Sequence, residues 1–209
     1  MNYTIFDTPV IRPIMRFLSL LILKFFGWRV EGKLPDIPKF VMIAAPHTSN
    51  WDLPLTLLVA FALKAKIYWM GKAAIFNRPF TGFFKWLGGI PIDRSKSNGV
   101  VKESIKQFEE NEKLILTIPP SGTRRKVLYW KTGFYYIACG ANVPIVLGFL
   151  DYSRKTGGIG YSYIPTGDIK SDFLEIQAFY SDIKGKYSLK SADILVEEPK
   201  AYSAQVFSQ

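Results

Sequence analysis

Short apolar runs rich in β-branched residues alternate with longer segments of helical periodicity along most of the chain. The runs that predict strands span residues 40–45, 67–70, 90–92, 114–118, 145–150 and 160–164. The segments that predict helices span residues 51–64, 79–87, 98–111, 131–141 and 171–183. This alternation predicts an α/β fold with a mixed, mainly parallel sheet covered by helices.

The length of the chain, 209 residues, fits one globular domain better than two. The composition is 48% hydrophobic, which is high for a protein without a long uncharged apolar run. We therefore expect a globular domain over residues 34–209, preceded by an N-terminal helix and linker over residues 1–33.

The N-terminal segment contains an apolar block, residues 17–23, that is much shorter than the ~20 residues a membrane-spanning helix needs. On a helical wheel, one narrow arc is polar and the opposite face is apolar. The arc holds Arg12, Arg16 and Ser19, and the apolar face holds Ile14, Phe17, Leu18, Leu21 and Phe25. This pattern predicts an amphipathic helix at a membrane interface, with its cations toward headgroups and Phe25, Phe26 and Trp28 in the acyl boundary. The alternative is a helix that caps the core of the domain itself.

The formal net charge of +10 favours anionic partners, which include phosphorylated small molecules, anionic lipids and nucleic acid. Nucleic acid is disfavoured, because no recognised motif is present and the aromatic residues lie within apolar runs. A single cysteine, Cys139, excludes an intramolecular disulfide, and with one histidine in the chain we predict no metal site. Cys139 lies in an apolar helical stretch and is predicted to be a small core residue.

The only histidine, His47, follows the first predicted strand, and Asp52 stands five residues later in the first turn of a predicted helix. The carboxylate of Asp52 can reach one ring nitrogen and leave the other free to take a proton from a hydroxyl group. The pair is then a general base with its orienting group. Equally, His47 can be a structural histidine, and Asp52 can serve the helix dipole.

Cations follow three further predicted strands: Lys72, Arg94 and Arg124. The loop that carries Arg124 also contains Ser121, Gly122 and Thr123. Together with His47, these residues belong to the edge of the sheet where open α/β folds bind ligands, and they predict an anion site. Taken singly, each is also consistent with an ordinary basic surface loop.

Four stretches in order resemble the motifs of the glycerolipid acyltransferases, the family of 1-acylglycerol-3-phosphate acyltransferases. "HTSNWD" matches the His-x4-Asp motif through His47 and Asp52, and "GGIPIDR" matches the second motif through Arg94. "SGTR" and "VPIVLG" stand where the third and fourth motifs are expected. The resemblance covers residues 40–148, about half of the chain.

The resemblance implies that His47 deprotonates an acceptor hydroxyl, that Asp52 orients it, and that the hydroxyl attacks an acyl thioester without an acyl-enzyme. The donor would be acyl-CoA or an acyl carrier protein, and no other cofactor is implied. The acceptor would be a lysophospholipid such as 1-acylglycerol-3-phosphate. Its phosphate would be held by Lys72, Arg94 and Arg124, and its site would be shaped by Gly122 and Thr123. The protein would be associated with the cytoplasmic face of a membrane.

One position departs from the family pattern: Ser121 stands where the third motif has glutamate. The change removes a charge and a hydrogen-bond acceptor from the predicted acceptor site. It leaves open an altered acceptor, reduced activity, a water bound in place of the carboxylate, or a non-catalytic lipid-binding member of the same fold.

Overall fold

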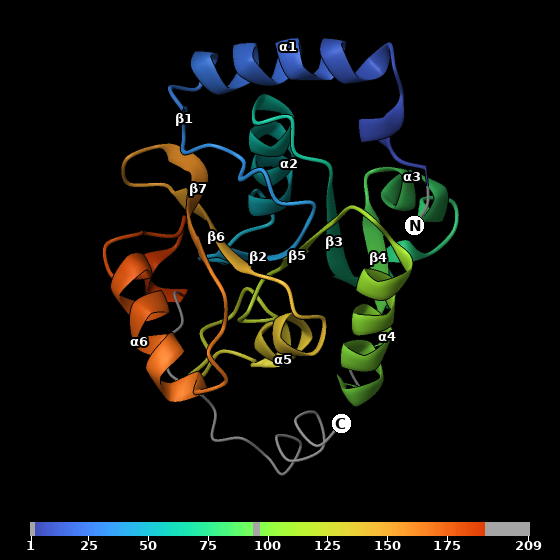
Figure 1. Cartoon of the computed structure of the whole chain (residues 1–209). Helices are drawn as coiled ribbons and strands as arrows, with labels where there is room; N and C mark the ends of the chain where they lie inside the picture. The colour runs from blue at the N-terminus through green and yellow to red at the C-terminus, as the bar shows by residue number, and fades with distance from the viewer. Residues whose placement is uncertain (1–2, 94–96, 191–209) are drawn as a thin grey trace.

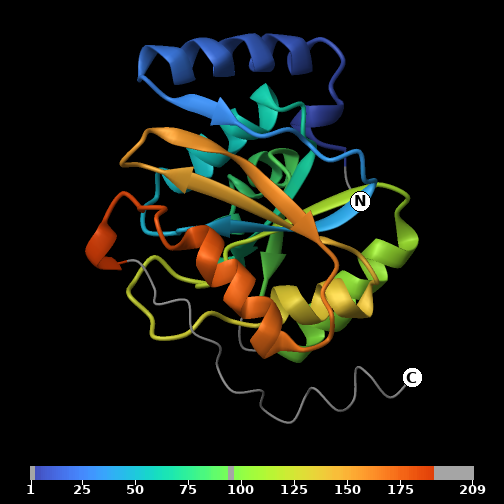
Figure 2. The same ribbon diagram turned by 60° about the vertical axis from the view of Figure 1, so that its left-hand side comes forward.

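The structure, a computed structural model, describes residues 3–93 and 97–190. Within these residues a seven-stranded sheet has the order β1-β7-β6-β2-β5-β3-β4 (Figures 1 and 2). The strands are β1 (Arg29–Glu31), β2 (Lys39–Ala45), β3 (Ile67–Lys72), β4 (Gly89–Ile92), β5 (Leu114–Ile118), β6 (Ile145–Asp151) and β7 (Thr156–Tyr163). The β6–β7 pair is antiparallel and the other pairs are parallel. The predicted mixed, mainly parallel α/β fold is therefore confirmed.

The central strands are apolar along their whole length because both faces of the sheet are covered. Every residue of β6 is buried, and four of the five residues of β5 are buried. Parallel strands between two helical layers need this continuous hydrophobicity. It is the reason why these strands stood out in the sequence as unbroken apolar runs.

Helices cover the two faces of the sheet as separate layers (Figure 1). α2 (Asp52–Ala62) packs on one face, and α1 (Ile11–Phe25) lies across it on the outside. On the other face lie α4 (Ser97–Glu110), α5 (Gly133–Gly140) and α6 (Ile169–Tyr180). Shorter elements are η1 (Ile5–Asp7), η2 (Ala73–Phe76), α3 (Thr81–Trp86) and η3 (Ser188–Lys190). The predicted helices all occur, with ends that differ by up to three residues.

α1 forms as predicted, and the apolar residues expected to face a membrane are exposed, whereas the alternative of a helix that caps the core with this face would bury them. The protein-facing side includes Ser19, which is fully buried, and Arg16, whose Nε donates a hydrogen bond to the Ala62 carbonyl on α2. The apolar side points outward, with Phe17 62% and Phe25 84% exposed. The stripe that faces the protein is nevertheless mainly apolar: Ile11, Met15 and Leu23 pack on the core together with buried Ser19, whereas Arg12 and Arg16 are exposed.

Trp28 is partly buried and so is less exposed than Phe25, and its expected place in an acyl boundary stays a prediction. Its ring packs edge-to-face against Tyr152, with centroids 5.1 Å apart and an interplanar angle of 88°. None of the helices in the described ranges combines the length and hydropathy needed to cross a membrane.

The predicted boundary between residues 33 and 34 stays a prediction. The strand on its N-terminal side, β1, pairs with β7, and Val41 on its C-terminal side lies in the central sheet. The two predicted segments therefore contribute strands to one sheet.

Gly32, directly after β1, offers a sharp test of how tightly this edge is packed. Its φ is +80°, and a Cβ atom there would lie 1.9 Å from the Ile159 carbonyl oxygen. We expect Gly32→Ala to lower the free energy of unfolding by about 2 kcal/mol or more, because the clash is with backbone and the left-handed conformation disfavours alanine. Urea unfolding measures the change.

Gly82, in α3, is the matched control, since a Cβ atom there meets nothing within 4 Å. Gly82→Ala should leave the protein as stable as the native chain or stabilise it by up to about 1 kcal/mol. Equal midpoints for the two variants would contradict the packing at Gly32.

Candidate active site

The carboxyl ends of four neighbouring parallel strands bring most of the predicted site residues to one edge of the sheet. β2, β5, β3 and β4 are adjacent, so the segments that follow them meet there. His47 follows β2, Lys72 ends β3, and Thr123 and Arg124 follow β5. Arg94, predicted for the segment after β4, lies outside the described residues.

His47 and Asp52 form the hydrogen-bonded pair that the sequence predicted. His47 Nδ1 lies 3.0 Å from Asp52 Oδ2, and the same oxygen accepts hydrogen bonds from the backbone N–H groups of Thr48 (2.8 Å) and Ser49 (2.9 Å). Asp52 is the first residue of α2 and Trp51 precedes it. The carboxylate therefore organises the turn that leads into the helix and contacts the imidazole at the same time. The structural and functional interpretations of Asp52 do not exclude each other.

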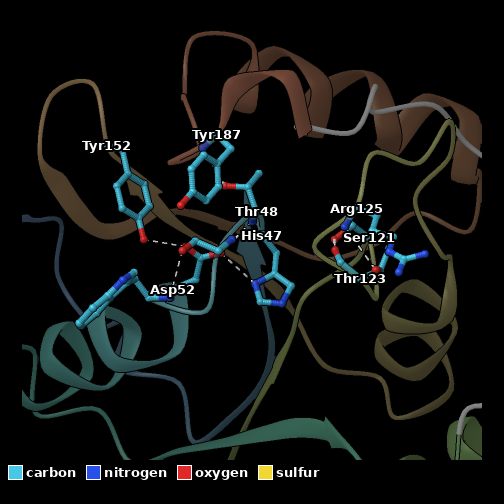
Figure 3. Close-up of polar contacts among 10 residues, drawn as sticks. His47, Thr48, Asp52, Ser121, Thr123, Arg125, Tyr152 and Tyr187 are labelled. Atoms are coloured by element: carbon cyan, nitrogen blue, oxygen red, sulfur yellow. Dashed lines mark hydrogen bonds and ion pairs between the residues drawn. The ribbon is translucent and has the colours of Figure 1, made fainter.

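The remaining oxygen of Asp52 is bound by a residue far away in the sequence. Tyr152, just after β6, donates a hydrogen bond from its hydroxyl to Asp52 Oδ1 at 2.7 Å (Figure 3). Asp52 is only 3% exposed. Burial pulls the pKa of Asp52 upward, but hydrogen bonds from His47, Tyr152 and Ser49 outweigh burial and hold that pKa below its ordinary value.

The charge of Asp52 fixes the state of the imidazole. A carboxylate can only accept hydrogen bonds, so the proton of neutral His47 lies on Nδ1 and its Nε2 has a free lone pair. His47 also lines the cavity described next, and its side chain is partly exposed. This is the arrangement that a general base for a hydroxyl group requires.

An apolar cavity of about 410 Å³ begins at this pair and extends between the sheet and α2. Five α2 residues follow one another along its wall with helical spacing, and Leu63 continues the wall past the end of the helix. They are Asp52, Leu53, Thr56, Val59, Ala60 and Leu63. The wall spans about 16 Å at 1.5 Å per residue. Ala65, Ile67 and Ile159 lie among the other lining residues, so the cavity has room for an elongated apolar group.

The loop after β5 contributes its later residues to the cavity. Thr123 and Arg124 line it, as predicted site residues, whereas Ser121 and Gly122 are not among its lining residues. The hydroxyl of Ser121 is buried and donates to the Thr123 carbonyl at 2.8 Å, within the loop (Figure 3). Gly122 has φ +61° and lies against the Lys131 side chain. Ser121 and Gly122 therefore shape the turn that presents Thr123 and Arg124.

Three residues at the site escaped the sequence analysis. Arg125 and Lys190 line the cavity beside Arg124 and Lys72, so they extend the cationic rim. Arg125 could have been recognised as the neighbour of Arg124 in the same loop, but Lys190 and Tyr152 lie in parts of the chain that carried no motif. The rim is thus more basic than predicted, which favours an anionic ligand.

Cys139, in α5, lies away from the residues that line this cavity. Burial raises the pKa of its thiol to about 11, so the group is protonated at neutral pH. Within residues 3–93 and 97–190 no group of three or more His, Cys, Asp or Glu side chains is arranged to hold a metal ion.

Fold and site together define an α/β protein with a histidine–carboxylate pair at the carboxyl edge of its sheet, opening onto an apolar cavity with a basic rim. A family model described as Acyltransferase matches residues 29–146, more than half of the chain. The chain therefore belongs to the acyltransferase family, which confirms the resemblance to the glycerolipid acyltransferases.

Among solved structures, the fold is similar to that of the 1-acyl-sn-glycerophosphate (LPA) acyltransferase PlsC from Thermotoga maritima. The two chains are 17% identical, the TM-score is 0.56, and the match covers 82% of this chain and 76% of the other. At this identity the likeness establishes the fold. None of the curated proteins matches the chain.

Proposed function

We propose that the protein transfers a fatty acyl group from an acyl thioester, either acyl-CoA or acyl carrier protein, to a hydroxyl of a lysophospholipid such as 1-acylglycerol-3-phosphate. The observation that carries the proposal is the position of the His47–Asp52 pair at one end of an apolar cavity. The cavity suits an acyl chain, and the basic rim suits the phosphate of an acceptor. Membership of the acyltransferase family supports the reaction class.

In this reaction His47 Nε2 takes the proton of the acceptor hydroxyl as its oxygen attacks the thioester carbonyl carbon. The new C–O bond forms and the C–S bond breaks, and the sulfur leaves with a proton returned from His47. The products are an ester and a free thiol, and no acyl-enzyme forms. Asp52, held as a carboxylate, stabilises the imidazolium that exists between the two proton transfers.

Lys72, Arg124 and Arg125 line the cavity. We assign them, together with Arg94, to the phosphate of the acceptor. Arginine binds phosphate with two parallel hydrogen bonds, and lysine adds a point charge. Ser121 has no carboxylate that would repel this phosphate. Its hydroxyl donates a hydrogen bond to the Thr123 carbonyl within the loop. The choice of acceptor is therefore governed by these cations and by Thr123.

The direct test is acyl transfer by the purified full chain in mixed micelles. Donors are acyl-CoA and acyl carrier protein, and acceptors are lysophosphatidate, a lysophospholipid with a larger headgroup, and dephosphorylated monoacylglycerol. We expect ester formation that prefers a phosphorylated acceptor. Transfer to monoacylglycerol alone would contradict the phosphate site, and binding of lipid without transfer to any acceptor would favour the non-catalytic alternative.

We also propose that the outward apolar side of α1 binds the membrane that holds the acceptor, on its cytoplasmic face. Phe17, Leu21 and Phe25 lie four residues apart on this side, and all three are exposed. Large exposed apolar surfaces mark contacts with membranes or partners. The nearby cations Arg12 and Lys24 favour an anionic surface.

Replacing Phe17, Leu21 and Phe25 with serine should weaken binding to anionic vesicles by at least roughly 30-fold, a loss of ~2 kcal/mol or more of apolar burial. Vesicle sedimentation measures the partition. The matched control replaces Leu128 and Leu174, which are exposed elsewhere, with serine. Equal loss of binding in both variants would assign the effect to general hydrophobicity and not to α1.

A further inference from the structure

Both oxygens of the Asp52 carboxylate accept hydrogen bonds, and Tyr152 is the donor to one of them. Oδ2 faces His47 and the backbone N–H groups of Thr48 and Ser49, while Oδ1 accepts the hydrogen bond from the Tyr152 hydroxyl at 2.7 Å (Figure 3). Tyr152 lies 100 residues after Asp52 in the sequence. We propose that Tyr152 is a positioning residue for acyl transfer, which acts on His47 through Asp52. This inference rests on the proposed function.

The hydrogen bond from Tyr152 fixes the plane of the Asp52 carboxylate. The hydrogen bonds to Oδ2 restrain rotation about the Cβ–Cγ bond from one side only, and the hydrogen bond from Tyr152 to Oδ1 adds a restraint from the other side. Because Asp52 is buried, a free Oδ1 would also be a charged acceptor without a partner, which is costly. The fixed carboxylate in turn sets the tautomer and the ring orientation of His47.

Tyr152 is itself held in place by segments from both ends of the described chain. Its ring packs edge-to-face on Trp28, and its backbone N–H donates to the Lys184 carbonyl at 2.9 Å. Burial and the hydrogen bond to Asp52 raise the pKa of Tyr152 far above its ordinary value, so the hydroxyl stays protonated and can only donate to the carboxylate. The residue is thus a preorganised donor and does not titrate in the working range.

The test is Tyr152→Phe in the full chain, which keeps the ring against Trp28 and removes only the hydroxyl. We expect kcat to fall about tenfold, as for the loss of one hydrogen bond to a charged group, with KM for donor and acceptor within about twofold of native. Tyr187→Phe is the matched control. The backbone N–H of Tyr187 donates to Thr48 Oγ1, so Tyr187 lies beside the segment that joins His47 to Asp52 (Figure 3). Its hydroxyl makes no hydrogen bond within the part of the chain described here.

A double-mutant cycle separates positioning through Asp52 from a general structural effect. In an Asp52→Asn background, Tyr152→Phe should change kcat by less than about twofold, since the carboxylate it positions is gone. A native kcat for Tyr152→Phe, or the same tenfold loss in both backgrounds, overturns the proposal. If the native chain and His47→Ala transfer equally, the proposed function fails instead.

A second measurement does not depend on activity. His47 is the only histidine, so imidazole ¹⁵N–¹H correlations report on this ring alone. We expect one Nδ1–H tautomer in the native protein and in Tyr187→Phe, and a mixture of tautomers in Tyr152→Phe. Identical spectra for all three proteins would mean that Tyr152 does not orient the pair, whether or not acyl transfer is observed.

Discussion

Replacing His47 with alanine is expected to lower kcat by about 10³-fold while the fold stays intact. General base catalysis contributes about 10²–10⁴-fold, and His47 is the only imidazole in the chain. Nε2 of this ring has the free lone pair that the acceptor hydroxyl needs, because Asp52 binds the other nitrogen. Initial rates of ester formation, measured with saturating donor and acceptor, give the change in kcat.

Two further measurements make this result interpretable. Thermal unfolding of His47→Ala should stay close to that of the native protein, since the side chain borders the cavity and is partly exposed. Asp52→Asn should also lower kcat, and the double variant should be little worse than His47→Ala, because the two side chains act as one unit. Native rates in His47→Ala would remove the general base from the proposed mechanism.

The strands that could be predicted from the sequence are those buried on both faces, because burial makes them unbroken apolar runs. β5 occurs at its predicted residues, 114–118, because it lies between covered faces and has no polar alternation to confuse its limits. β1 was missed, since it has three residues and lies at the edge of the sheet with an exposed Arg29. β7 was predicted four residues late, because its start is rich in glycine. There Gly158 allows close approach to β1: a Cβ atom would lie 2.0 Å from the Glu31 carbonyl oxygen.

The His47–Asp52 contact was predictable because it is local and closes within one turn before α2. Tyr152 was not, because only the pairing of β6 beside β2 brings it to Asp52. The helical wheel of α1 identified the apolar side that is exposed, but it did not identify Ile11, Met15 and Leu23 as the residues that pack on the protein. Those contacts depend on the surface of the folded domain against which α1 lies, and the sequence of α1 alone does not contain that surface.

The second large effect is expected from a substitution in the part of the apolar cavity farthest from Asp52. It changes the preference of the protein for the length of the acyl chain. Ala60 is buried on α2 and lines the cavity about two helical turns beyond Asp52. Phenylalanine at this position would fill the deeper part and leave the space next to His47 open. We therefore expect Ala60→Phe to lower kcat/KM for a long-chain donor about 100-fold relative to a short-chain donor, as expected when several methylene groups lose their apolar contacts.

Paired kcat/KM values for long- and short-chain acyl thioesters measure this ratio directly. Ala178→Phe, at an exposed position of α6, is the control for the added ring and should leave the ratio unchanged. If Ala60→Phe instead raises KM for the acceptor and leaves donor preference as it was, the cavity holds the acyl chain of the lysophospholipid. Both outcomes test the same α2 wall of the cavity. If the length of the donor's acyl chain affects kcat/KM, the donor occupies the cavity beside His47, and if only the KM of the acceptor changes, the acceptor occupies it.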